Sequence, residues 1–136
     1  MKAKLFKSKN IYLLFLMPLL LAMQCGEDDE YSGFETSYYI ENNASIKLLY
    51  ITDFDQIIKI EPQTIQLIGS SLNPETKPIP PTQSLLLSDI KLYKDEGGNF
   101  ILGYEQDPLN DGYWQFFEPT ENRFDYKLVI TDELLN

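Results

Sequence analysis

The sequence predicts an all-β protein: an antiparallel immunoglobulin-like β-sandwich of seven or eight strands, preceded by a helical signal peptide. Short segments after residue 35 alternate apolar and polar residues with a period of two, as half-buried strands do. Turn-forming Asn, Pro and Gly residues separate these segments. No ten-residue window after residue 24 keeps helical spacing without Pro, Gly or a β-branched cluster.

The N-terminal segment, residues 1–24, has the pattern of an export signal. Lys2, Lys4, Lys7 and Lys9 precede an apolar run over residues 11–23, and no acid occurs among them. This order of a basic region and a short apolar region is typical of a signal peptide. The run is shorter than the roughly 20 residues that a membrane-spanning helix needs.

Cys25 follows this run directly and is the only cysteine of the chain. The local sequence Leu-Ala-Met-Gln-Cys resembles the lipobox of bacterial lipoproteins, in which the cysteine is acylated after cleavage. Acylation would remove an otherwise unpaired thiol, and several acyl chains anchor a protein stably. We therefore expect a lipid anchor at Cys25. The alternative is a membrane anchor with an incidental cysteine beside it.

Residues 25–35 are rich in charge, Gly and Ser, which predicts a flexible acidic tether. The acidic run consists of Glu27, Asp28, Asp29 and Glu30. It resembles the surface-export signal of Bacteroidota-type lipoproteins, which implies an address on the outer face of the outer membrane. The alternative is a solvated spacer.

The remaining residues, 36–136, are expected to form the folded domain. Without residues 1–24, seven bases stand against 21 acids, for a net charge of −14. This acidity argues against nucleic acid as a partner and against electrostatic adhesion to anionic lipid. No second cysteine is present to form an internal disulfide, so packing must hold the domain together.

The predicted strands follow one another with few interruptions. Asn42-Asn43, Pro62-Gln63 and Glu96-Gly97-Gly98-Asn99 are predicted turns, the last a hairpin. The strand segments are 38–41, 46–51, 58–60, 65–67, 90–93, 100–104, 114–116 and 124–130. The residues predicted to face inward are Ile46, Leu48, Ile58, Ile60, Ile90, Leu92, Phe100, Leu102, Tyr126, Leu128 and Ile130.

Residues 70–83 contain Pro74, Pro78, Pro80 and Pro81, and proline cannot donate to a strand ladder. We expect this segment to cross between the two sheets or to cover a sheet edge. A functional loop is the other interpretation.

Most catalytic chemistry is excluded by composition. The chain contains no histidine, which removes histidine-based nucleophilic catalysis and the usual zinc sites. No motif predicts a cofactor, so none is expected. Two groups of polar residues remain as candidates for calcium, although tight turns have the same composition. These groups are Asp53 with Asp55, and Glu105, Asp107, Asn110 and Asp111.

The segment Tyr113-Trp114-Gln115-Phe116-Phe117 places aromatic residues on both faces of one predicted strand. In one interpretation Tyr113, Trp114 and Phe117 contact a ligand, because exposed aromatics beside acids and amides suit a glycan or a protein. In the favoured interpretation Trp114 and Phe116 belong to the core, and Tyr113 and Phe117 lie beneath the proline-rich segment.

Taken whole, the chain resembles small Bacteroidota-type surface lipoproteins of unknown function. The likeness rests on the lysine-rich start, Cys25, the acidic tether, and the strand segments around residues 39–43, 90–93 and 126–131. The resemblance implies a β-sandwich in the cell envelope and no catalytic residues. We expect a non-enzymatic binding or accessory module that contacts an envelope protein or a glycan. A structural or assembly lipoprotein and a small hydrolase are the alternatives.

Overall fold

The computed structural model of this chain describes residues 34–52, 56–73 and 75–135. The predicted signal peptide, Cys25 and the acidic run at 27–30 lie outside these residues. The first strand begins at Phe34, slightly before the predicted start of the domain at residue 36, because Phe34 and Glu35 already pair with Asn73 and Leu72.

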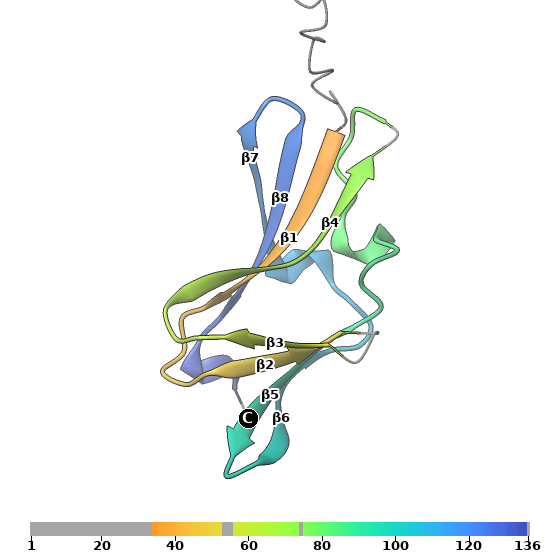
Figure 1. Ribbon diagram of the computed structural model, residues 1–136. Helices are drawn as coiled ribbons and strands as arrows, with labels where there is room; N and C mark the ends of the chain where they lie inside the picture. Colours follow the sequence, from red (N-terminus) through yellow and green to blue (C-terminus); the bar gives the residue numbers. More distant parts are fainter. Residues whose placement is uncertain (1–33, 53–55, 74, 136) are drawn as a thin grey trace, which may run out of the picture. The chain divides into compact units, whose positions relative to one another are not determined.

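The described residues form eight strands in two four-stranded sheets (Figure 1). Sheet A has the strand order β4-β1-β8-β7, and sheet B has the order β3-β2-β5-β6. This arrangement agrees with the predicted all-β sandwich and its strand number. The strands are β1 (Phe34–Asn42), β2 (Leu48–Ile51), β3 (Ile57–Ile60), β4 (Thr64–Asn73), β5 (Ile90–Glu96), β6 (Asn99–Gln106), β7 (Trp114–Thr120) and β8 (Arg123–Ile130). Short 3-10 helices span Pro81–Gln83, Asp111–Tyr113 and Asp132–Leu134.

The expectation of a wholly antiparallel sandwich is wrong at one pair of strands. The first strand, β1, runs parallel to the last strand, β8, and lies beside it in sheet A (Figure 1). Alternation along a sequence determines which side chains share a face, but it carries no information on the direction of a distant strand. The immunoglobulin-like type is not confirmed, because constant-type immunoglobulin domains divide seven strands into sheets of four and three.

One apolar core draws residues from both sheets. Strand β8 alternates strictly, with Phe124, Tyr126, Leu128 and Ile130 buried, as its sequence predicts. The core cluster consists of Tyr38, Ile40, Leu48, Tyr50, Ile60, Leu87, Ile90, Leu92, Tyr104, Trp114, Tyr126, Leu128 and Ile130. Ile58 packs against this cluster while remaining half-exposed. The alternation therefore predicted most of the inward-facing residues correctly.

Two predicted core residues, Phe100 and Leu102, are instead 48% and 40% exposed. Leu92 pairs with Tyr104, whereas Tyr93 pairs with Leu102, so Gly103 is an extra residue in β6. This β-bulge reverses the alternation towards the hairpin tip. Gly103 also allows a close approach, since a Cβ there would lie 3.2 Å from Cγ of Lys94.

Ile46, also predicted to be in the core, is 37% exposed. It lies in the bend that precedes β2, and β2 begins only at Leu48. The side chain of Asn42 shapes this bend: its Nδ2 donates to the carbonyl of Ile46 at 2.8 Å, and its Oδ1 accepts from the amide of Ala44 at 3.1 Å. Asn42 Nδ2 also donates to the carbonyl of Ile60 at 3.1 Å, so this buried amide joins β1 of sheet A to β3 of sheet B.

The proline-rich segment carries the chain from β4 in sheet A to β5 in sheet B, which confirms the predicted crossover. Buried polar groups hold its path. Thr36 Oγ1 accepts from Asn73 Nδ2 at 2.6 Å and from the amide of Ile79 at 3.2 Å. The hydroxyl of Tyr38 donates to the carbonyl of Ile79 at 2.9 Å. The start of the crossover is therefore fastened to β1, the neighbour of β4 within sheet A.

The hairpin predicted at residues 96–99 is present between β5 and β6. Gly97 and Gly98 both have positive φ angles, of 65° and 93°. Such angles suit glycine and the twist of a two-residue hairpin turn.

We predict that Leu128→Ala lowers the free energy of unfolding by about 2–5 kcal/mol, because it opens a cavity where Leu128 is only 1% exposed. Val129→Ala, a truncation of the next residue on the outer face, should lower it by less than about 1 kcal/mol. Urea unfolding of the full chain in detergent, followed through the fluorescence of the single tryptophan, measures both. Equal or reversed effects would contradict the register of β8.

Candidate binding face

The outward side of sheet A carries a hollow lined by side chains from several strands. Tyr39 points outward because Tyr38 and Ile40 point into the core. Asp125 and Lys127 point outward for the same reason on β8. The parallel register places Tyr39 beside Lys127, and the antiparallel register of β7 and β8 places Phe117 beside Asp125. Side chains from distant parts of the sequence therefore share one surface.

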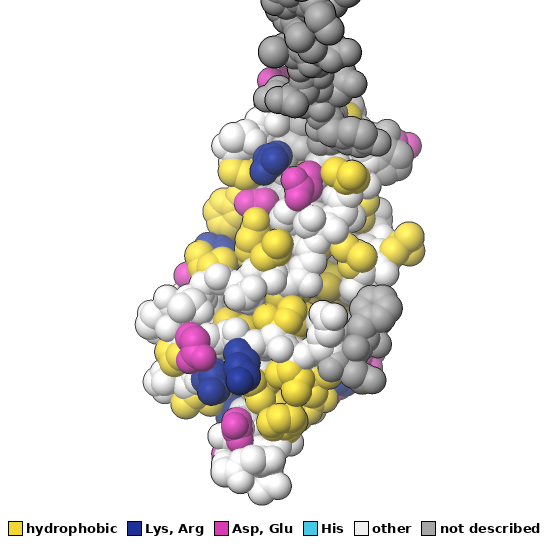
Figure 2. Space-filling view, in the orientation of Figure 1, with side chains coloured by type: hydrophobic (Ala, Val, Ile, Leu, Met, Phe, Trp, Pro, Cys, Tyr) yellow, Lys and Arg dark blue, Asp and Glu magenta, His cyan; other side chains and the backbone are white. Residues whose placement is uncertain are grey.

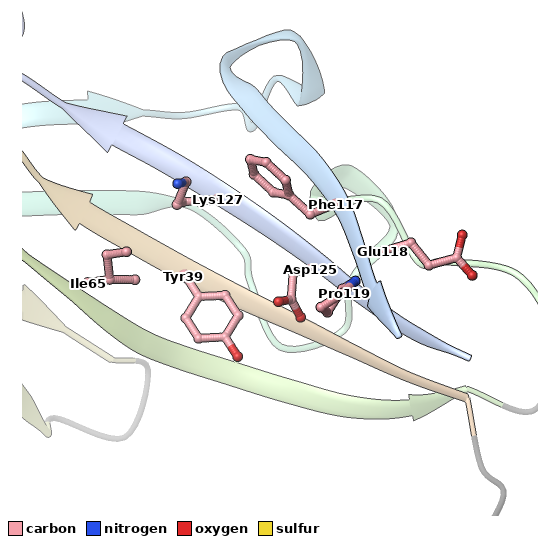
Figure 3. Close-up of a pocket in the computed structure, with 7 residues that line it drawn as sticks. All are labelled: Tyr39, Ile65, Phe117, Glu118, Pro119, Asp125 and Lys127. Carbon is pink, nitrogen blue, oxygen red and sulfur yellow. The ribbon is translucent and has the colours of Figure 1, made fainter. Parts of the chain in front are cut away.

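We call this hollow the outer groove. It is shallow and has a volume of about 540 Å³. All four strands of sheet A contribute to it (Figure 3). Its lining residues are Tyr39, Ile65, Phe117, Glu118, Pro119, Asp125 and Lys127.

An irregularity in β7 forms one wall of the outer groove. Pairing between β7 and β8 is regular up to Phe117, then shifts, and resumes at Thr120 opposite Arg123. Glu118 and Pro119 occupy the shifted stretch. Proline is tolerated there because β7 is an edge strand, where a missing amide donor leaves no ladder bond broken.

The two cations on this face are each engaged by an acid. Lys127 Nζ lies 2.6 Å from an oxygen of Glu41, and Arg123 lies 3.7 Å from Glu35. Lys127 Nζ also lies 4.9 Å from the centre of the Phe117 ring, in a cation–π contact. The hydrogen bond from Lys127 holds the pKa of Glu41 below its ordinary value.

Asp125 differs from these residues. It has no hydrogen-bond or ion-pair partner within the part of the chain that the structure describes. Partial burial raises the pKa of its carboxyl, and the negative charge of Glu35 raises the pKa further, against a smaller opposing effect of Arg123. The groove thus contains a half-buried carboxylate whose charge nothing nearby fully offsets.

The three aromatic residues predicted as ligand contacts lie in different environments. Phe117 lines the outer groove and is 44% exposed. Tyr113 is exposed in the 3-10 helix before β7 and does not line the groove. Trp114 is buried, meets Tyr38 edge to face, and donates from Nε1 to Gln106 Oε1 at 3.2 Å. The expectation that Tyr113 and Phe117 lie beneath the proline-rich segment is wrong, because the two residues are 59% and 44% exposed. Of the three candidates, only these two can contact a ligand at the surface.

Phe116, favoured as a core residue, lies at the rim of the core. It is 48% exposed, but its ring contacts the rings of Phe124 and Tyr126, with centroids 6.2 and 5.3 Å away. The interpretation that placed Trp114 and Phe116 in the core is therefore correct for Trp114 and only partly correct for Phe116.

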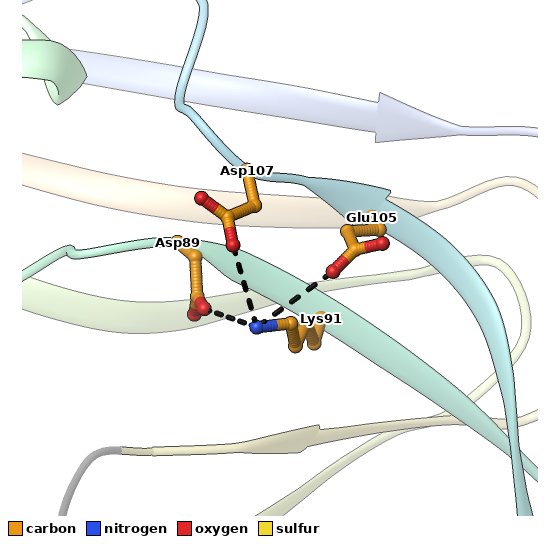
Figure 4. A network of polar contacts seen from close by, with 4 residues as sticks. All are labelled: Asp89, Lys91, Glu105 and Asp107. Carbon is orange, nitrogen blue, oxygen red and sulfur yellow. Dashed lines mark hydrogen bonds and ion pairs between the residues drawn. The ribbon is translucent and has the colours of Figure 1, made fainter.

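The acidic residues considered for calcium have structural partners where they are described. Glu105 and Asp107, together with Asp89, which was not among those candidates, surround Lys91 (Figure 4). The distances from Lys91 Nζ to the carboxylate oxygens are 3.7, 3.8 and 2.5 Å, respectively. Asp89 above all, through its hydrogen bond, raises the pKa of Lys91. A lysine ammonium therefore occupies the position at which these carboxylates converge.

Asn110 and Asp111 serve the turn before β7. Asn110 Oδ1 accepts from the amide of Gly112 at 2.9 Å, and Asp111 accepts from the amide and hydroxyl of Thr82 at 2.9 and 2.7 Å. Asp53 and Asp55 lie outside the described residues. Among residues 34–52, 56–73 and 75–135, no three acids, histidines or cysteines are grouped as metal ligands.

Comparisons with protein-family models, with curated protein sequences and with solved structures find no match to this chain. Within the described part, no helix is long and apolar enough to cross a membrane. The outer groove is therefore interpreted from its own chemistry.

We predict that Asp125→Asn raises the free energy of unfolding at about pH 7 by up to about 1 kcal/mol, an effect limited by solvent screening. The folded chain holds this proton more tightly than the unfolded chain, so the ionised carboxylate destabilises the fold at neutral pH. The gain should shrink as the pH falls through the pKa of Asp125 and vanish below the ordinary pKa of an aspartic acid. Denaturant unfolding at several pH values measures it.

The matched control is Glu133→Gln, which removes the same charge from an exposed position in the last 3-10 helix. It should leave stability nearly unchanged. A destabilising effect of Asp125→Asn at neutral pH would show that the carboxylate is satisfied in the folded chain.

Proposed function

We propose that this chain is a lipid-anchored protein of the outer membrane surface whose domain is a non-enzymatic binding or accessory module. The outer groove would contact an envelope protein or a glycan. The observation that carries the proposal is the groove itself: half-exposed aromatic and aliphatic side chains stand beside a carboxylate that lacks a partner among the described residues.

The composition of this surface supports binding. Ile65 and Leu67 of β4 are 57% and 44% exposed, and Phe117 of β7 is 44% exposed, all on the outer side of sheet A. Exposed apolar side chains are common singly, but a group of them around a hollow with a few polar residues is typical of an interaction site.

A non-enzymatic role is supported by the arrangement of the acids. Glycoside hydrolysis needs two carboxyl groups that face each other across the scissile bond. Figure 3 shows the carboxylate of Glu118 directed away from Asp125, so the two acids of the groove do not face each other. The chain also lacks histidine, the most common general base.

The cellular address in this proposal rests on the sequence alone. The apolar run that ends at Cys25 supports export and acylation, and the acids at 27–30 support transport to the cell surface. The likeness to Bacteroidota-type surface lipoproteins rests on the same residues.

A structural or assembly role is the second candidate, because sheet B also exposes apolar side chains. Tyr93 and Leu102 are direct neighbours across β5 and β6 on the outward side of that sheet, where Leu102 is 40% exposed and Tyr93 is partly exposed. Leu49, beside Tyr93 on β2, is only 3% exposed. Figure 2 shows hydrophobic side chains gathered on the surface near the base of the β5–β6 hairpin. An apolar surface of this kind suits a packed assembly.

In-cell photocrosslinking separates the two candidates. The amino acid p-benzoylphenylalanine would replace Phe117 on sheet A and, as a matched control, Phe100 on the β5–β6 hairpin, since the two rings are 44% and 48% exposed. We expect a discrete adduct from position 117 and none from position 100, because the partner contacts the outer groove. Adducts are detected by immunoblotting and mass spectrometry.

Adducts from position 100 alone would favour the assembly role, and no adduct from either position would contradict a binding function. The same strain carrying Cys25→Ser tests the anchor: it should lose incorporation of a fatty-acid analogue and lose the adduct from position 117. Equal labelling with and without Cys25→Ser would contradict lipidation.

A further inference from the structure

The ion pairs on the outer side of sheet A leave Asp125 without a partner among the described residues. Lys127 is held by Glu41 at 2.6 Å, and Arg123 by Glu35 at 3.7 Å. Asp125 lies between these two pairs along the face, since its neighbours in the register are Ser37 and Phe117. Neither cation makes an ion pair with Asp125.

From this arrangement we infer that the outer groove receives a cationic side chain, an arginine in particular, from a partner protein. The inference deepens the proposed function and rests on it, since it names the chemistry of the partner at the same surface. Asp125 would form the ion pair, and the flanking rings would hold the stem and the guanidinium plane of the arginine.

The walls of the groove suit such a side chain. Figure 3 shows Asp125 between the ring of Tyr39 and the ring of Pro119, with Phe117 on the neighbouring strand. A guanidinium group stacks on aromatic faces and also donates two parallel hydrogen bonds to a carboxylate. Phe117 already packs against the ammonium group of Lys127 at 4.9 Å, so its ring is accessible to a cation.

The shape of the groove favours one inserted side chain over an enclosed small molecule. Its volume of about 540 Å³ is ample for a side chain and part of the flanking backbone, but the hollow is shallow. A small molecule in this groove would stay largely exposed to solvent. A partner protein that inserts one side chain would also cover the groove with the surface around that side chain.

Charge favours a cation over a neutral sugar. A sugar hydroxyl can donate to Asp125, but it leaves the repulsion between Asp125 and Glu35 in place. A guanidinium group offsets both negative charges, and it replaces the water that partial burial has removed from Asp125.

The test is binding of a short peptide to the ¹⁵N-labelled full chain in detergent, followed by NMR. The probe is acetyl-Gly-Arg-Gly-amide, and the control is the same peptide with citrulline, which has the shape of arginine without its charge. We expect the arginine peptide to shift the amides of Tyr39, Phe117 and Asp125 with a Kd in roughly the millimolar range. The citrulline peptide should bind at least about fivefold more weakly.

Two variants locate the interaction. Asp125→Asn should weaken binding of the arginine peptide by about tenfold, whereas Glu133→Gln, which removes the same charge from the last 3-10 helix, outside the lining of the groove, should leave the Kd within about twofold. Equal binding by Asp125→Asn and the parent chain would overturn the inference, as would shifts spread over the acidic surface or an absence of shifts.

Two further outcomes assign the groove to another occupant and overturn the inference. Shifts of the same amides by a neutral oligosaccharide, with none by the arginine peptide, would identify a glycan platform, and the proposed binding function would stand. Shifts that depend on protein concentration without any peptide would identify a second copy of this chain. If the proposed binding function itself is wrong, the photocrosslinking experiment will give no adduct from position 117, whichever peptide binds in the NMR experiment.

Discussion

The parallel pairing of β1 with β8 is the contact on which the rest of the structure depends. It places the first described strand in the middle of sheet A, between β4 and β8. The inward residues of the pair, such as Tyr38 and Tyr126, stack in the core with ring centroids 6.1 Å apart. The outward residues, Tyr39 and Asp125, line the outer groove. A slip of one residue would exchange the core set with the surface set, so one register determines both stability and the binding surface.

Asp125 in the outer groove does not contribute to the stability of the fold. Buried polar residues of this domain, such as Thr36, Asn42 and Asn73, have partners that fasten strands to loops or to other strands. Asp125, by contrast, is partly buried beside another negative charge. Functional sites commonly retain groups that oppose stability, because the same groups are needed to bind a partner. An arginine from a partner would convert this unfavourable charge into a favourable contact.

The sequence predicted the strands more completely than it predicted the site. The alternation in residues 124–130 assigned Tyr126, Leu128 and Ile130 correctly to the inward face of β8, because a strand with one face in the core must alternate. It failed at Phe100 and Leu102, where the extra residue Gly103 reverses the faces, and a bulge leaves no periodic signal. Phe117 was recognised as a candidate contact, but Tyr39 and Asp125 were not. Their proximity depends on pairing between strands at opposite ends of the domain, which local patterns do not encode.

Carboxyl footprinting tests the central claim most directly, namely that the outer groove is the surface covered by a partner. Carboxylates are labelled with an amine in native membranes and in the chain purified in detergent, and the labelling at each acid is measured by mass spectrometry. Asp125 should be labelled less in native membranes than after purification, whereas Glu105, exposed on sheet B, should be labelled equally in both. Equal labelling of Asp125 in both preparations, or protection of Glu105 alone, would contradict the claim.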